Sequence, residues 1–200
     1  VRFSVEDFVP TRLLVTLKAL EPYFVPGKML PIDVEGRYLF GSAAGGLGGD
    51  ASLIIRRHPN PFPQFKDYQF GLLDDRYVSS RFDVDFPTLD ANGKAKLNVT
   101  ATPQIEATVP LQAVIQAAVR DAGGRPQLGT IRLDVQTYPY MIGIKGKFKN
   151  GAIDFQDKVA NIDVITVSPN GARVSASNLH YTLFAEETFY NWSFEQGRNW

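Results

Sequence analysis

The most regular pattern in the chain is the stretch Leu30-Pro31-Ile32-Asp33-Val34-Glu35-Gly36-Arg37-Tyr38-Leu39-Phe40. Its apolar side chains take alternate positions: Leu30, Ile32, Val34, Tyr38 and Phe40. A period of two places one face of a strand in a core and the other face in water. Gly36 interrupts the inward row, which indicates a bulge or a close approach by another backbone, and Pro31 belongs near the strand's start or on a sheet edge. The stretch therefore predicts a half-buried β-strand.

The same alternation recurs along the chain and is separated by turn sequences such as Asp90-Ala91-Asn92-Gly93. Short strands with this punctuation are typical of antiparallel sandwiches, so the sequence predicts an all-β fold. The further rows are Leu13/Val15/Leu17, Ala51/Leu53/Ile55, Phe82/Val84/Phe86, Ala95/Leu97/Val99, Ile131/Leu133/Val135 and Leu179/Tyr181/Leu183.

Residues 111–119 fit two periods. Leu111, Val114, Ile115, Ala118 and Val119 have the spacing of an amphipathic helix, whereas every second residue from Leu111 to Val119 also fits a strand. We expect a strand, because a hairpin through residues 121–126 would pair this stretch with residues 130–135, which have a similar length. A helix here would move the fold towards α+β.

Two further features concern the layout of the chain. Residues 58–66 contain His58-Pro59-Asn60-Pro61-Phe62-Pro63, which predicts an extended surface loop with polyproline-like backbone. A strand ends near Tyr138-Pro139-Tyr140 and new apolar runs begin beyond it. We therefore expect a domain boundary at residue 138, and a second unit in residues 139–200 with too few strands to close a sandwich.

Composition excludes several kinds of function. Lys plus Arg and Asp plus Glu are both 21, so the net charge is zero and no basic stripe is available for nucleic acid. The chain has no cysteine, which removes disulfides, thiolate nucleophiles and cysteine-based zinc sites. No apolar stretch is long enough to span a bilayer, and the first residue, Val1, suggests a processed or excised segment.

Candidate catalytic residues are few. His58 and His180 lack partner motifs, and we expect both to be ordinary exposed or rim histidines. Ser42 is not in a G-x-S-x-G elbow, and the glycine-rich stretch 41–49 lacks the Gly-Lys-Ser/Thr ending of a phosphate loop, so both predict a turn. We therefore expect no catalytic residue, no cofactor site and no enzyme.

Two further patterns concern metal and sugar binding. The pairs Asp74/Asp75 and Asp83/Asp85 lack a D-x-D-x-D-G loop, so we expect solvated charges and no metal site. Phe189, Tyr190, Trp192, Phe194 and Trp200 form an aromatic cluster, for which packing in a core or between domains is the favoured interpretation. An exposed cluster would indicate the alternative, an Ig-like adhesion or carbohydrate-binding module.

Several motifs, taken in order, resemble the bacterial α2-macroglobulins over nearly the whole chain, and the first two are the most specific. They are Val5-Glu6-Asp7-Phe8-Val9-Pro10-Thr11-Arg12-Leu13, Gly36-Arg37-Tyr38-Leu39-Phe40-Gly41-Ser42-Ala43-Ala44-Gly45-Gly46-Leu47, Tyr68-Gln69-Phe70-Gly71, Asp90-Ala91-Asn92-Gly93-Lys94-Ala95, Ala122-Gly123-Gly124-Arg125-Pro126, Ile142-Gly143-Ile144-Lys145 and Asp163-Val164-Ile165-Thr166-Val167-Ser168-Pro169-Asn170-Gly171.

The resemblance implies tandem macroglobulin domains from the middle of a much longer chain. Each would be a seven-stranded antiparallel β-sandwich of macroglobulin, Ig-like or fibronectin III-like type. Residues 1–9 would be the last strand of a preceding domain or a linker, 10–138 one domain, and 139–200 the first part of the next. The two are expected to move as rigid bodies about the boundary.

The family also implies a function for the parent protein, a broad-spectrum periplasmic endopeptidase inhibitor that traps proteases after a bait region is cut. The family's Cys-x-x-Gln thioester cannot lie in this chain, which lacks cysteine. We therefore expect a scaffold without chemistry. Its expected partners are neighbouring macroglobulin domains, target proteases through the full-length protein and a periplasmic penicillin-binding protein. The expected location is the periplasm, with a lipid anchor on the inner membrane outside this segment.

Overall fold

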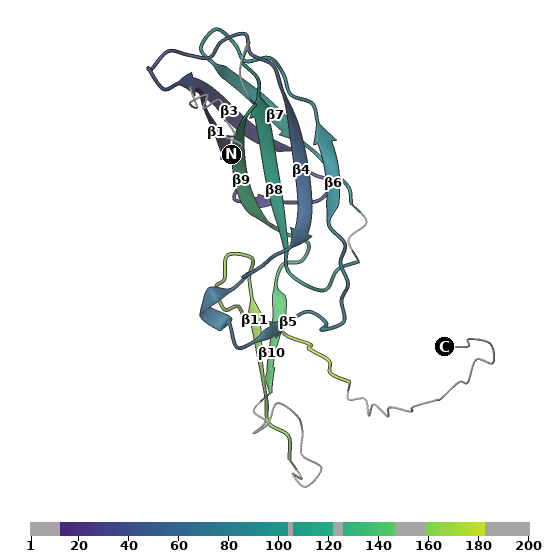
Figure 1. Cartoon of the computed structure of the whole chain (residues 1–200). Helices are drawn as coiled ribbons and strands as arrows, with labels where there is room; N and C mark the ends of the chain where they lie inside the picture. Colours follow the sequence, from purple (N-terminus) through teal and green to yellow (C-terminus); the bar gives the residue numbers. More distant parts are fainter. Residues whose placement is uncertain (1–12, 104–105, 122–125, 147–158, 183–200) are drawn as a thin grey trace, which may run out of the picture.

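The computed structural model describes residues 13–103, 106–121, 126–146 and 159–182. Apart from one turn of 3-10 helix, η1 (Pro63–Phe65), every regular element in these ranges is a strand (Figure 1). The predicted all-β class is thereby confirmed. No helix in the described ranges is long and apolar enough to cross a membrane.

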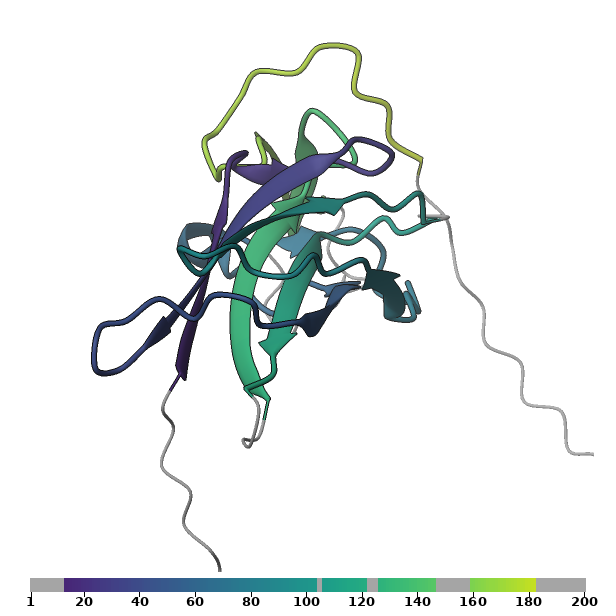
Figure 2. The ribbon, with the colours of Figure 1, turned by 90° about the horizontal axis from the view of Figure 1, so that it is seen from above.

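Two sheets form a sandwich. The first holds β1 (Leu13–Ala19), β3 (Leu30–Tyr38) and β7 (Lys94–Val99), which are antiparallel in the order β1-β3-β7. The second holds five strands in the order β2-β9-β8-β4-β6, and Figures 1 and 2 show the two sheets facing each other. Its strands are β2 (Tyr23–Phe24), β9 (Gln127–Val135), β8 (Leu111–Val119), β4 (Gly49–Arg57) and β6 (Ser80–Val84).

The prediction of seven antiparallel strands needs one correction. The two-residue strand β2 runs parallel to β9, with Tyr23 opposite Asp134 and Phe24 opposite Val135. Phe24 is fully buried, so this short pairing places a large apolar side chain in the core. Every other strand pairing in the described residues is antiparallel.

The predicted inward row of β3 is largely correct. Leu30, Ile32 and Val34 are buried, and Tyr38 packs against the same core. Phe40 does not belong to the row, because β3 ends at Tyr38 and the chain turns there, with the Gly41 amide donating to the Tyr38 carbonyl at 2.8 Å. Phe40 is therefore 77% exposed and stacks on the Tyr38 ring.

Gly36 fits the predicted close approach. A Cβ atom at this position would lie 2.7 Å from Leu89 Cδ1 and 3.3 Å from Ala44 Cβ. The backbone around it is also bonded on both sides, because its amide donates to the Gly93 carbonyl and its carbonyl accepts from the Ala44 amide. Glycine is thus required where the loop after β3 folds back over the strand.

The ambiguous stretch 111–119 is a strand, as expected. β8 lies in the middle of the five-stranded sheet between β4 and β9 and is antiparallel to both. One face of β8 is buried along its whole length, and Gln112 and Val114 on the other face are buried too, which explains why its apolar pattern also fits a helix.

A third sheet lies at one end of the sandwich (Figure 1). Its order is β11-β10-β5, with β10 (Met141–Gly146) antiparallel to β11 (Ile162–Val167) and to the short strand β5 (Gln69–Phe70). β5 comes from the connection between β4 and β6 of the sandwich. The third sheet is therefore built from two distant parts of the chain.

Two predictions about local structure are wrong. Residues 175–182 contain no strand; Leu179 and Tyr181 are 43% and 94% exposed, and Asn178 takes a left-handed backbone with φ 61°. Leu183, the last residue of that predicted row, lies outside the described residues.

The predicted polyproline-like loop at 58–66 instead contains η1, and Phe62 within it is 6% exposed.

Candidate functional site at the junction of the sandwich and the third sheet

The junction is formed by residues 58–79, which we call the β4–β6 segment. This segment leaves the sandwich after β4, forms η1 and β5, and returns to the sandwich at β6. β5 lies along the edge of β10, where Phe70 is opposite Gly143 and Gln69 is opposite Ile144. Sandwich and third sheet are therefore joined twice, by the covalent connection after β9 and by strand pairing.

A small apolar core holds the junction together. Phe62 and Phe70 are each 6% exposed, and their ring centroids are 4.6 Å apart with the planes tilted by 53°. Ile165 and Val167 of β11 are buried in the same cluster. Gly143 lies beneath the Phe70 ring, since a Cβ atom there would be 2.7 Å from two of its carbons.

Polar contacts surround this apolar core. Gln64 Nε2 donates to the Gly171 carbonyl at 2.9 Å, and Lys145 Nζ donates to Asp67 Oδ2 at 3.0 Å. The hydrogen bond between Lys145 and Asp67 lowers the pKa of Asp67 and raises the pKa of Lys145. The Arg173 guanidinium lies 5.1 Å from the centre of the Phe65 ring, a cation–π contact.

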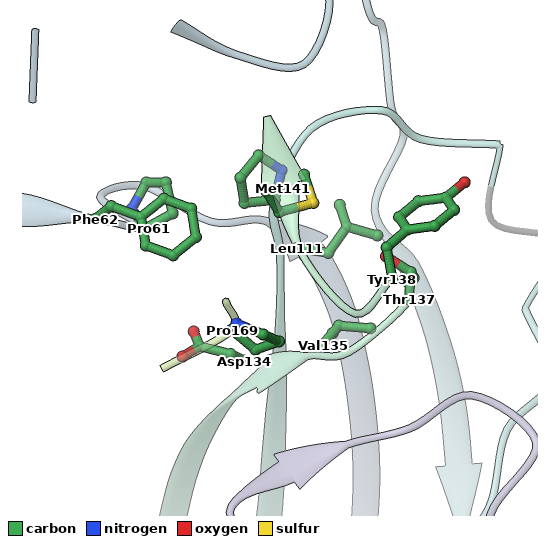
Figure 3. A pocket seen from close by; sticks show the side chains of 10 residues that line it. Pro61, Phe62, Leu111, Asp134, Val135, Thr137, Tyr138, Met141 and Pro169 are labelled. Atoms are coloured by element: carbon green, nitrogen blue, oxygen red, sulfur yellow. The ribbon is translucent and has the colours of Figure 1, made fainter. Parts of the chain in front are cut away.

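Figure 3 shows a cavity in the junction, between the β4–β6 segment, the start of β8, the end of β9 and the start of β10. Phe62, Leu111, Val135 and Met141 line it, so its walls are mainly apolar. Its volume is about 20 Å³. That is room for about one water molecule, so this cavity is a packing gap and not a ligand site.

His58, which the sequence predicts to be an ordinary exposed or rim histidine, is partly buried and has specific partners. Its side chain is 14% exposed, and its Nε2 lies 3.2 Å from Asp134 Oδ1 on β9. Its Nδ1 accepts a hydrogen bond from the Asn60 amide at 3.1 Å, and its Nε2 also lies 3.2 Å from Gln112 Nε2 on β8. The histidine thus fixes the start of the β4–β6 segment to the sandwich.

Asp75 has a similar role at the other end of the segment. Its Oδ2 accepts from the Thr108 amide at 2.6 Å and from the Thr108 hydroxyl at 2.8 Å, and its Oδ1 accepts from the Tyr77 amide at 3.0 Å. The bond from the Thr108 amide is the main cause that lowers the pKa of Asp75. Its carboxylate therefore holds the loop of residues 106–109 against the end of the β4–β6 segment.

The remaining candidates do not converge. His180 is exposed, Asp83 has a 96% exposed side chain, and Ser42 lies in the loop that follows β3. Among the described residues, no group of three or more His, Asp or Glu side chains could hold a metal ion. The aromatic cluster at 189–200 and the proposed strand at 1–9 lie outside the described residues.

Sequence reasoning missed the junction residues Phe62, Phe65, Tyr68 and Phe70. Their partners on β10 and β11 lie more than 70 residues further along the chain, so no local period reveals them. One signal was available, because four aromatic residues within a proline-rich connection are unusual for a solvated loop.

Two packed sheets, together with a third sheet that takes a strand from the same unit, define an all-β protein in which the best-defined site is an internal contact. The chain belongs to the bacterial alpha-2-macroglobulin family. The family model described as Bacterial Alpha-2-macroglobulin MG5 domain matches residues 11–136, and the one described as Bacterial macroglobulin domain 6 matches residues 143–200.

Curated relatives carry the same family name. Alpha-2-macroglobulin of Escherichia coli K12 is 24% identical over 99% of this chain and 13% of its own length. An alpha-2-macroglobulin homolog of Yersinia pestis is 27% identical over 92% of this chain and 9% of its own length. The chain thus spans about an eighth or less of these relatives.

Solved structures agree with the fold. Escherichia coli alpha-2-macroglobulin activated by porcine elastase has a TM-score of 0.65 at 25% identity, over 84% of this chain and 15% of that one. Salmonella alpha-2-macroglobulin reacted with methylamine has a TM-score of 0.64 at 24% identity, over 84% of this chain and 12% of that one.

Proposed function

We propose that this chain is a scaffold segment of a bacterial alpha-2-macroglobulin that inhibits endopeptidases by trapping them after bait cleavage. The segment carries no chemistry of its own and holds other parts of the protein in place. The observation behind the proposal is the apolar core of the junction, in which Phe62, Phe70 and Val167 are buried.

The relatives support the trapping part of the proposal. One is described as activated by porcine elastase and another Escherichia coli structure as trypsin activated, so proteases act on proteins of this family. An enzyme is disfavoured for this chain, because its candidate groups His58 and Asp75 are both engaged in holding the β4–β6 segment.

We also place a domain boundary at residues 138–139, with a second sandwich beginning in 139–200. The two family matches end and begin on either side of this position. The third sheet has apolar side chains on both faces, and those that face away from Phe70 are 41% to 52% exposed: Ile142, Ile144, Ile162 and Val164. Such a face favours a sheet that belongs to a larger sandwich.

The proposed location is the periplasm, with a lipid anchor on the inner membrane and a penicillin-binding protein as a partner of the parent protein. Fractionation of cells that express the full-length protein tests the location. Membrane association that survives salt washing and is lost after removal of the lipidation site is the expected result.

The scaffold role is tested in the full-length protein by loosening the junction. A Gly/Ser insertion after Tyr138 lengthens the covalent connection, and Phe70→Asp removes the strand contact. Trapping is measured as a loss of protease activity on a protein substrate while activity on a small peptide substrate is retained. Together the two changes should abolish trapping, so the protease should keep its activity on the protein substrate.

Leu73→Asp is the matched control, because Leu73 lies in the same segment and is 82% exposed. With the insertion and Leu73→Asp, trapping should be retained. Normal trapping by the protein with the insertion and Phe70→Asp would contradict the scaffold role.

A further inference from the structure

We infer that the β4–β6 segment holds the third sheet on the sandwich without help from the covalent connection, so that the two form one body. This differs from the expectation of free rigid-body motion about residue 138. It concerns the described chain itself and does not depend on protease trapping.

The first argument is the dependence of the third sheet on β5. Without β5, the described part of this sheet is the hairpin of β10 and β11. An isolated two-stranded hairpin is marginally stable in water. β5 adds a third strand, and its Phe70 covers Gly143, Ile165 and the neighbouring face.

The second argument is the number of different sites at which the segment is fixed. On the third sheet, Lys145 bonds to Asp67 and the Gly171 carbonyl accepts from Gln64. On the sandwich, His58 contacts Asp134 and Asp75 accepts from Thr108. The segment is thus attached at both of its ends to the sandwich and along its middle to the third sheet.

The third argument is the contrast with the covalent connection. Residues 136–140 contain no strand, and Tyr138 within them is 51% exposed. The described contacts of this connection with the sandwich include a hydrogen bond from the Gln136 amide to the Phe24 carbonyl at 2.9 Å. Strand pairing and buried aromatic packing lie on the β4–β6 segment instead.

The test cuts the connection and asks whether the parts stay together. A recognition sequence for a site-specific protease is inserted after Pro139 in the 200-residue chain, the folded protein is cleaved, and the product is run on size exclusion at micromolar concentration. The fragments should co-elute at the position of the uncut chain and separate only in denaturant. Separation under native conditions would overturn the inference.

Variants show which contact holds the fragments. Phe70→Ala and Phe62→Ala should each weaken fragment association at least tenfold, whereas Leu73→Ala should leave it unchanged. These truncations avoid a buried charge, and circular dichroism before cleavage reports whether each chain is folded. Association as tight as in the unmodified chain, for both Phe variants, would show that the β4–β6 segment does not hold the sheet.

The result separates this inference from the proposed function. Fragments that stay together, in a protein that fails to trap proteases, would support the inference that the β4–β6 segment holds the third sheet and would refute the trapping role. Fragments that separate, in a protein that does trap proteases, would refute only the inference about the β4–β6 segment.

Discussion

Asp75 is the residue at which the structure gives a clear pH dependence. Hydrogen bonds from Thr108 hold its pKa below the ordinary value of about 3.9. Because the folded pKa is the lower one, the carboxylate contributes stability that is present above the unfolded value and is lost as the pH falls through the folded value.

Asp75→Asn should therefore lower the free energy of unfolding at pH 7, and its deficit relative to the unmodified chain should shrink as the pH falls below about 4. Urea titrations at several pH values measure both effects. Asp74→Asn is the control, because Asp74 is next to Asp75 in the chain and is exposed. An equal deficit for Asp75→Asn at every pH would show that the charge of Asp75 is not what stabilises the loop.

Gly143 tests the packing of the junction at a single atom. Gly143→Ala places a methyl group 2.7 Å from the Phe70 ring and 3.0 Å from Ile165 Cγ1. Overpacking of this kind costs about 1–3 kcal/mol, so the free energy of unfolding should fall by that amount. Gly48→Ala, where a Cβ has open space, is the matched control. Equal stability of the two variants would mean that Phe70 does not lie over Gly143.

At the scale of elements, β3 carries the core of the sandwich. Val34 is 1% exposed, so Val34→Asp buries an unpaired charge, which costs several kcal/mol against a total stability of about 5–15 kcal/mol. The sandwich should unfold, as seen by circular dichroism. Leu14→Asp on β1 is the control, because Leu14 is 56% exposed and opposite Arg37. A folded Val34→Asp chain would show that the inward register of β3 is misassigned.

Strands with one buried face were the predictable part of the fold. In β3 the apolar row and the more exposed row alternate along the strand, so the sequence alone reveals which side chains face inward. β8 is buried on both faces, and only its hairpin with β9 identified it as a strand. Phe40 was misplaced because the period says nothing about where a strand ends.

The junction was not predictable in the same way. β5 has two residues, too few for any period, and its partner β10 is separated from it by the whole of β6 to β9. Prolines in residues 58–66 correctly indicated irregular backbone but suggested solvent exposure. Burial of Phe62 and Phe70 comes from a long-range contact, which composition and spacing do not encode locally.

At the scale of the whole molecule, the sandwich and the third sheet share the β4–β6 segment and form one rigid unit. Thermal unfolding should therefore show one transition for the unmodified chain. Phe70→Asp should split it, with the third sheet melting first, because an isolated hairpin is marginal. Differential scanning calorimetry measures this, and Leu73→Asp should keep one transition. A single unchanged transition for Phe70→Asp would mean that the two parts are not coupled through β5.

The most direct test of the single body is the distance between its two parts. The chain has no cysteine, so spin labels attach only at Lys96→Cys on β7 and Ala172→Cys after β11, both exposed positions. Pulsed electron paramagnetic resonance should give one narrow distance distribution, which broadens when Phe70→Asp is added. A distribution that is already broad in the unmodified background would contradict the account.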